Sequence, residues 1–231
     1  MRVLKGALSM DVRTSQLQSL FFIVCLCGVS LLAAGFPDPV VDNKSLLGDL
    51  LKGDQTAVLA GGCFWCAEAV FRQIAGVDNV VSGYSGGDAA SAHYDMVSTG
   101  KTDHVETVKI TYNPRKISYG QLLKVFFDVA HDPTQIDRQG PDIGPQYRSM
   151  IFYSDPEQKR VAEAYILQLN QARVFHAPIV TRVVELKAFF PGEEHHQNYC
   201  NRNPKDRYVV EVAMPKVEKT KKQLPELLKK Q

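Results

Sequence analysis

The stretch QTAVLAGGCFWCAEAVFRQIAGV, residues 55–77, holds a strand, a turn and a helix in close succession. Residues 55–60 form a short apolar run, which predicts a buried strand. Three apolar residues then recur at helical spacing, namely Val70, Phe71 and Ile74. The Gly61-Gly62 pair lies between strand and helix and allows another group to approach the backbone closely. Cys63 is therefore expected where a strand passes into a helix.

Strands and helices interleave along the rest of the chain. Further strands are expected at residues 79–84, 105–113, 149–153 and 181–189, and further helices at 118–131 and 156–173. The pattern Ser-x-x-Gln at Ser118 predicts a capping box at the start of one helix. Residues 131–148 form a long polar loop, and loops longer than about 12–15 residues are uncommon and often functional. The pattern predicts an α+β fold, a two-layer sandwich with a mixed sheet.

Length, composition and charge indicate one globular domain. The 231 residues are 45% hydrophobic, which suffices for a single substantial core. The formal charge of +2 gives no sign of nucleic-acid binding. We expect a catalytic domain over residues 55–215, followed by a solvated basic tail at 216–231.

The N-terminus has the features of an export signal. Arg2, Lys5 and Arg13 precede the apolar run LFFIVCLCGVSLLAAGF, which ends in small residues. We expect residues 1–35 to be an export signal cleaved near Ala34, or an uncleaved membrane anchor, with a linker at 36–54. The protein would then be periplasmic or secreted. Its three remaining cysteines are an odd number, which argues against a purely structural disulfide framework.

Cys63 is a candidate nucleophile. Its expected place at a helix N-terminus favours the thiolate, because the helix dipole and free N–H groups stabilise negative charge there. Phe64 and Trp65 follow directly and can form the wall of an apolar pocket. The alternative is that Cys63 is a small buried hydrophobe and the aromatics belong to the core.

Cys66 completes a Cys-x-x-Cys pair, which suits a dithiol/disulfide couple. Cys66 is also compatible with half of a zinc site, with Cys200, His195 and His196 as the other ligands. No second Cys-x-x-Cys supports the zinc hypothesis, and the two histidines are equally typical of surface or structural positions.

Glu106 is a candidate proton donor. Alternation in the strand VETVKITY places it on the same face as Val108, Ile110 and Tyr112. A carboxyl group on an apolar face is desolvated, which raises its pKa toward neutral pH. The alternative is an edge or end position, where Glu106 is simply exposed to water. Three tyrosines, Tyr94, Tyr147 and Tyr199, offer phenols that can donate to an oxygen, although each suits a core position equally well.

Taken together, these stretches resemble the A-type peptide methionine sulfoxide reductases. The matching segments are GGCFWCAEAVF, GVDNVVSGYSGG, HYDMVSTGKTDHVETVKITYNP, the run from ISYGQ to MIFY, and HHQNY. They span roughly residues 55 to 215 in unbroken order. The ordered set is far more specific than the GCFW motif alone.

The resemblance implies an enzyme that reduces the S epimer of methionine sulfoxide, free or in proteins, on a fold with a ferredoxin-like core. It implies no metal and no organic cofactor, and a thioredoxin as the usual reductant. For an exported protein, a thioredoxin-like periplasmic partner is expected, and a monomer is favoured. The resemblance assigns the nucleophile to Cys63 and the methyl-group pocket to Phe64 and Trp65. It assigns the acid to Glu106, the assisting tyrosines to Tyr94 and Tyr147, and the loop aspartate to Asp142.

The chain departs from the family pattern at the recycling thiol. Many relatives carry recycling cysteines near the C-terminus, whereas no cysteine follows Cys200 here. Two smaller departures are Pro141 in place of the usual Asn and His195 in place of a frequent aromatic residue. Resolution of the Cys63 sulfenic acid then falls to Cys200, which is the favoured choice, to Cys66, or to an external thiol.

Two other functions are compatible with parts of the sequence. A general dithiol oxidoreductase would use Cys63 and Cys66 but leaves Glu106 and the tyrosines unexplained. A catalytically silent sulfoxide-binding or redox-sensing module is disfavoured by the presence of both Cys63 and Glu106.

Overall fold

The computed structural model describes residues 35–42 and 53–230 of the chain. The strands in this part are β1 (Gln55–Gly61), β2 (Val77–Ser85), β3 (Val105–Tyr112), β4 (Arg138–Gln139), β5 (Asp142–Ile143), β6 (Ser149–Tyr153), β7 (Arg182–Glu185) and β8 (Phe190–Pro191). The helices are α2 (Phe64–Phe71), α3 (Tyr94–Val97), α4 (Tyr119–Val125), α5 (Pro156–Gln171), α6 (Tyr199–Arg202) and α7 (Met214–Gln223).

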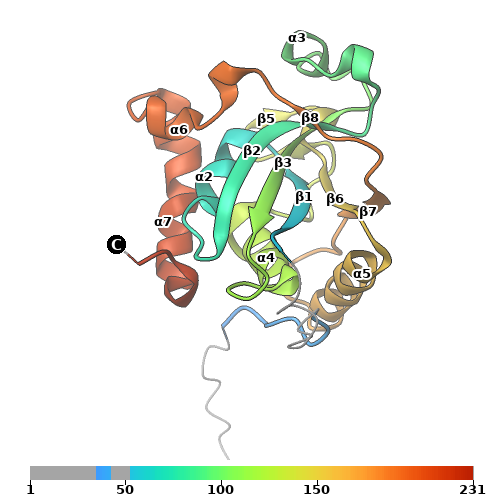
Figure 1. Cartoon of the computed structure of the whole chain (residues 1–231), viewed down its shortest axis with the longest axis vertical. Helices are drawn as coiled ribbons and strands as arrows, with labels where there is room; N and C mark the ends of the chain where they lie inside the picture. Colours follow the sequence, from blue (N-terminus) through green and yellow to red (C-terminus); the bar gives the residue numbers. More distant parts are fainter. Residues whose placement is uncertain (1–34, 43–52, 231) are drawn as a thin grey trace, which may run out of the picture. The chain divides into compact units, whose positions relative to one another are not determined.

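The main sheet of the described residues has the strand order β7-β6-β1-β3-β2-β8 (Figure 1). β6 and β7 run parallel. The other neighbouring strands, β6-β1, β1-β3, β3-β2 and β2-β8, pair antiparallel. Apart from α3 and the short strands β4 and β5, the elements β1, α2, β2, β3, α4 and β6 occur in β-α-β-β-α-β order along the chain. The predicted α+β class with a mixed sheet is confirmed. A separate two-stranded ribbon, β4-β5, lies within the long polar loop.

Local sequence signals set the helix starts. The side chain of Ser118 accepts from the backbone N–H of Gln121 at 3.1 Å, and Gln121 accepts from the Ser118 N–H at 3.0 Å, so the predicted capping box is present. Asp155 caps α5 ahead of Pro156 in the same way, by accepting two backbone N–H bonds. The strand expected at 181–189 ends at Glu185, because its partner β6 ends opposite it at Tyr153.

The sheet has an apolar core on each face. The larger core packs α2, α4 and α7 together with inward residues of the central strands, among them Leu59, Val108 and Ile110. A smaller cluster on the opposite face includes Val58, Val105 and Phe152 and is covered by Leu186 and Phe189. The alternation predicted for β3 therefore holds, since Glu106, Val108, Ile110 and Tyr112 are all buried.

The first residues of the expected linker pack against the domain. Asp42 accepts from the Gly120 N–H at 3.0 Å and from the Ser118 hydroxyl at 2.5 Å. The Tyr165 hydroxyl donates to the Pro37 carbonyl at 2.6 Å. The sequence predicts a linker here, whereas the structure shows residues 36–42 packed on the domain. The reason is that the first N–H groups of α4 have no partner within the helix, and the Asp42 carboxylate accepts one of them.

The C-terminal residues also differ from the solvated tail expected at 216–231. They begin within α7, which lies alongside α2 (Figure 1). Val217, Thr220 and Leu224 are buried on one face of this segment, while Lys221 and Lys222 are exposed. The chain end is fixed by the Leu227 carbonyl, which accepts from the Ala75 N–H at 2.7 Å. Frequent lysines conceal this helical spacing in the sequence.

Of the expected export signal, residues 1–35, residues 1–34 lie outside the described part of the chain. Among the residues that are described, no helix has the length and apolar character needed to cross a bilayer.

Candidate active site

Cys63 lies at the turn from β1 into α2, as the sequence predicts. Its carbonyl accepts the first helical hydrogen bonds, from the N–H groups of Cys66 and Ala67. Gly62 before it has a φ of +89°, and a Cβ at this position would lie 2.5 Å from the side chain of Gln139. Glycine at position 62 therefore allows the polar loop at 131–148 to approach the backbone next to the thiol.

Glu106 faces the same helix start from β3. It is only 3% exposed, and its Oε2 accepts from the backbone N–H of Phe64 at 2.9 Å. Burial raises the pKa of Glu106 to about 8, although the Phe64 hydrogen bond partly opposes the shift. The carboxyl group is therefore largely protonated at neutral pH, as the strand alternation leads one to expect.

The two nearby thiols of Cys63 and Cys66 interact directly. Burial, together with the hydrogen bond to Cys66, raises the pKa of the Cys63 thiol. The same hydrogen bond lowers the pKa of Cys66 to about 7. The expectation of a thiolate on Cys63 from the helix start alone thus differs from the structure, because desolvation and the neighbouring sulfur outweigh the helix dipole. Cys66 is therefore the more acidic thiol of the pair.

Aromatic rings surround the turn. Phe64 is 1% exposed, while the partly exposed Trp65 stacks on Tyr199 with ring centroids 3.7 Å apart and planes 5° apart. The His196 ring lies 5.2 Å from Phe64 and 4.5 Å from Tyr94. The structure therefore gives Phe64 and Trp65 the apolar surroundings expected of a pocket and adds Tyr199 and His196 to it. The sequence signalled Tyr199 only as a phenol and left His196 as a structural histidine.

Tyr94, Tyr147 and Asp142 gather around the same centre. Burial, followed by the charges of Glu106 and Cys63, raises the pKa of both Tyr94 and Tyr147. These phenols therefore stay protonated and can donate hydrogen bonds. Burial also raises the pKa of Asp142, which accepts from the Tyr208 hydroxyl at 2.6 Å.

Sequence reasoning missed Tyr208. It follows Asp206 and Arg207 in a stretch without a recognisable motif, and the fold brings it to Asp142 across 66 positions of the chain. The sulfur of Cys66 lies 3.7 Å from its hydroxyl. Such a contact depends on tertiary structure alone.

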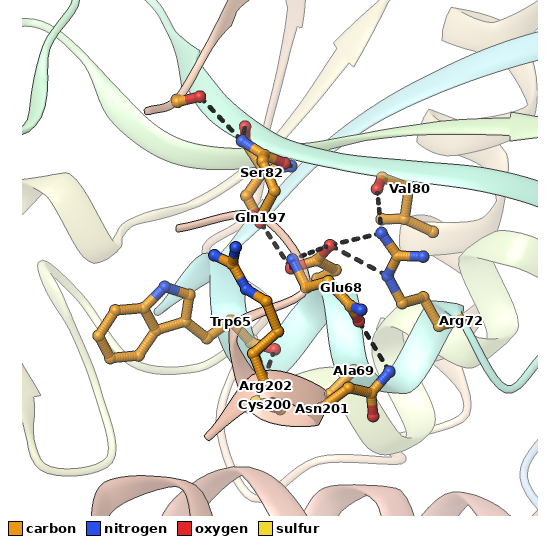
Figure 2. A network of polar contacts seen from close by, with 12 residues as sticks. Trp65, Glu68, Ala69, Arg72, Val80, Ser82, Gln197, Cys200, Asn201 and Arg202 are labelled. Carbon is orange, nitrogen blue, oxygen red and sulfur yellow. Dashed lines mark hydrogen bonds and ion pairs between the residues drawn. The ribbon is translucent and has the colours of Figure 1, made fainter. Parts of the chain in front are cut away.

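Cys200 has a different environment from Cys66. Its sulfur bonds to the Trp65 carbonyl at 3.5 Å (Figure 2), and burial raises its pKa to about 12. All three described cysteines are free thiols. Cys66 lies one helical turn from Cys63, and a hydrogen bond between the two thiols shifts the pKa of each. Within residues 35–42 and 53–230, no group of three or more His, Cys, Asp and Glu side chains is arranged to hold a metal ion.

A buried carboxylate joins α2 to the segment that carries Tyr199 and Cys200. Glu68 is 2% exposed and pairs with Arg72 at 2.8 Å, and Arg72 in turn donates to the Val80 carbonyl (Figure 2). Glu68 also accepts from the backbone N–H of Asn198 and from the Ser82 hydroxyl. This network fixes the start of α6, and with it the ring that stacks on Trp65.

We expect Glu68→Gln to lower the free energy of unfolding by about 2–4 kcal/mol, because Arg72 loses its charged partner at a buried site. We also expect KM for the substrate bound beside Trp65 to rise, since the Trp65–Tyr199 stack loses its support. Urea unfolding and steady-state kinetics measure the two effects. Glu163→Gln, which removes an exposed carboxylate 3.9 Å from Lys159, should change the stability by less than about 0.5 kcal/mol. Equal losses for both variants would contradict the role given to Glu68.

The chain matches known proteins over the region just described. The family model described as "Peptide methionine sulfoxide reductase" matches residues 55–228. A peptide methionine sulfoxide reductase of Synechocystis is 50% identical over 195 residues, which are 84% of this chain and 91% of the relative. One from Chromobacterium violaceum is 48% identical and covers 75% of this chain and 98% of its own length.

Solved structures give the same result. Methionine sulfoxide reductase A of Corynebacterium diphtheriae superposes with a TM-score of 0.59 at 33% identity, covering 74% of this chain and 88% of its own. Mxr1 from Saccharomyces cerevisiae in reduced form has the same TM-score at 32% identity, covering 66% of this chain and 87% of its own.

Proposed function

The chain belongs to the A-type peptide methionine sulfoxide reductase family, and on this basis we propose a role in catalysis for each residue of the site. The enzyme reduces methionine-S-sulfoxide, free or in proteins, to methionine in a thiol-dependent reaction, and so repairs oxidised proteins. It uses an external dithiol and no prosthetic cofactor. The observation that supports our assignment is the buried Glu106 carboxyl at the helix start that carries Cys63.

Cys63 and Glu106 divide the chemistry between sulfur and oxygen. A sulfoxide is a poor electrophile until its oxygen is protonated, so Glu106 donates a proton to that oxygen while the sulfur of Cys63 attacks the substrate sulfur and passes its own proton to the Cys66 thiolate. Tyr94 and Tyr147 donate hydrogen bonds to the same oxygen. Phe64 and Trp65 hold the methyl group and exclude water. Methionine leaves, and Cys63 becomes a sulfenic acid.

Cys66 is the resolving thiol in our proposal. It is hydrogen-bonded to Cys63, its pKa is lowered to about 7, and a thiolate there can attack the sulfenic acid directly. Cys200 is a weaker candidate than the sequence indicates, because its thiol bonds to the Trp65 carbonyl and its pKa is raised to about 12. These properties support Cys66 over Cys200, the choice favoured from the sequence, as the resolving thiol.

Disulfide mapping tests this assignment. The reduced protein is treated with excess methionine sulfoxide and no reductant, released methionine is counted, and disulfides are identified by mass spectrometry. We expect one methionine per chain and a Cys63–Cys66 bridge. Cys200→Ser is expected to give the same bridge, and Cys66→Ser to stop at the Cys63 sulfenic acid. A Cys63–Cys200 bridge in the unaltered protein would make Cys200 the resolving thiol, and no released methionine would contradict the reductase function.

The reductant is proposed to be a thioredoxin-like dithiol protein, since a Cys63–Cys66 disulfide needs an external dithiol to reopen it. We also propose that the protein is exported, periplasmic or secreted. The support is the basic and apolar pattern of residues 1–35. Sequencing the N-terminus of the protein isolated from its cells should give a start near Gly35 or Phe36. A start at Met1 would indicate an uncleaved anchor or an unexported protein instead.

A further inference from the structure

Tyr208 places its hydroxyl group between the sulfur of Cys66 and the carboxylate of Asp142. Its Oη donates to Asp142 Oδ2 at 2.6 Å and lies 3.7 Å from Cys66 Sγ. Tyr208 also lowers the pKa of Cys63, against the larger effect of burial. The edge of its ring contacts Trp65, with centroids 5.9 Å apart. A phenol therefore links the sulfur of Cys66 to the carboxylate of the loop aspartate.

The hydrogen bonds have a direction. A phenol has a single proton, and Tyr208 gives it to Asp142, so its oxygen is free to accept the Cys66 S–H. Thiol, phenol and carboxylate thus form a chain along which a proton can pass from Cys66 to Asp142. Burial raises the pKa of Asp142, which makes its carboxylate a better acceptor for that proton.

This hydrogen-bonded path for the proton is needed only after methionine has left, when Cys66 attacks the sulfenic acid of Cys63. In the resting enzyme, the hydrogen bond from Cys63 lowers the pKa of Cys66. Once Cys63 carries the sulfenic oxygen, its S–H no longer exists and this stabilisation is lost. Cys66 must still lose its proton before it can attack. The neighbouring phenol and carboxylate are in place to take it.

We propose that Tyr208 is a catalytic residue of the disulfide-forming step, where it passes the Cys66 proton to Asp142 as Cys66 attacks Cys63. The proton moves from Cys66 Sγ to Tyr208 Oη while the phenol proton moves to Asp142 Oδ2. An electron pair of Cys66 forms the S–S bond, the S–O bond of the sulfenic acid breaks, and the departing hydroxide takes the proton from Asp142 to become water. Cys66 is oxidised and Cys63 reduced. This inference rests on the proposed role of Cys66 as the resolving thiol.

Other groups also influence the proton of Cys66. Those that influence it or its partners are Cys63 at the N-cap of α2, Glu106 on β3, Asp142 on β5, Cys200 on α6 and Lys216 on α7. The proton relay predicts a specific pH dependence. Loss of the Tyr208 hydroxyl should slow disulfide formation most at low pH, where Cys66 keeps its proton. It should slow this step least at high pH, where Cys66 loses its proton without help.

A rapid-quench experiment with Tyr208→Phe separates the two half-reactions. Reduced protein is mixed with excess methionine sulfoxide at pH 6 and pH 9, and released methionine, trapped sulfenic acid and the Cys63–Cys66 disulfide are counted at each time. Relative to methionine release, we expect disulfide formation in Tyr208→Phe to be roughly 10- to 100-fold slower at pH 6, with sulfenic acid accumulating. The slowing of disulfide formation in Tyr208→Phe should be several-fold smaller at pH 9. Tyr153→Phe, a phenol on β6 outside the site, is the matched control.

Asp142→Asn breaks the chain at its other end and should show the same pH-dependent delay, which keeps the test available if Tyr208→Phe fails to fold. Disulfide formation at the unaltered rate at pH 6, or a delay equal at both pH values, would overturn the proposal. Failure of the unaltered protein to release methionine would instead contradict the reductase function, and a Cys63–Cys200 bridge would contradict only the role of Cys66.

Discussion

Replacing Cys63 with Ser is expected to reduce methionine release to the uncatalysed level, a loss on the order of 10⁴-fold or more. A hydroxyl group at this position stays protonated near neutral pH and is a far weaker nucleophile than sulfur. It also cannot form the sulfenic acid and disulfide through which the oxygen is removed. The measurement is methionine release from a mixture of the two sulfoxide epimers, in which the unaltered enzyme should consume half.

The other cysteines provide the controls for this result. Cys66→Ser and Cys200→Ser are each expected to release one methionine per chain in the absence of reductant, since neither thiol attacks the sulfoxide. Substantial turnover by Cys63→Ser would show that another thiol is the nucleophile. Release of no methionine by Cys66→Ser would show that the pair acts as a unit in the first step.

Glu106→Gln is expected to slow sulfoxide reduction by about 10²- to 10⁴-fold, the range typical of a lost general acid. An amide of the same shape can still accept from the Phe64 N–H but has no acidic proton to give. The thiol should remain reactive toward a small alkylating reagent, because the substitution leaves Cys63 in place. Single-turnover methionine release and the alkylation rate measure the two properties separately.

The pH profile of the unaltered enzyme follows from the same group. Burial raises the pKa of Glu106 to about 8, so the proton donor is present below pH 8 and is lost above it. The thiol pair loses its first proton near pH 7, where the pKa of Cys66 lies. The single-turnover rate should therefore rise through pH 7 and fall through pH 8.

Glu106→Gln should lose the falling limb of this profile. Glu68→Gln removes another buried carboxyl group nearby and should retain it. If the falling limb persisted in Glu106→Gln, it would belong to another group, and the role of Glu106 as the acid would be wrong.

The sequence by itself determined the features that depend on neighbouring residues. Strand alternation placed Glu106 on the buried face, the Ser-x-x-Gln pattern placed the start of α4, and the Gly pair before Cys63 placed the thiol at a strand-to-helix turn. Each of these signals acts over a few residues, because side-chain direction and capping are local properties of the backbone.

Tertiary structure alone decided which groups share the site and what charge each carries. Cys66 is the more acidic thiol of the pair because burial and a sulfur–sulfur hydrogen bond outweigh the helix dipole at Cys63. Tyr208 meets Asp142 only through the fold, and the basic C-terminal residues pack through an apolar face that lysines obscure in the sequence. Desolvation and long-range contacts depend on what surrounds a residue in space, and a chain read in order contains little of that information.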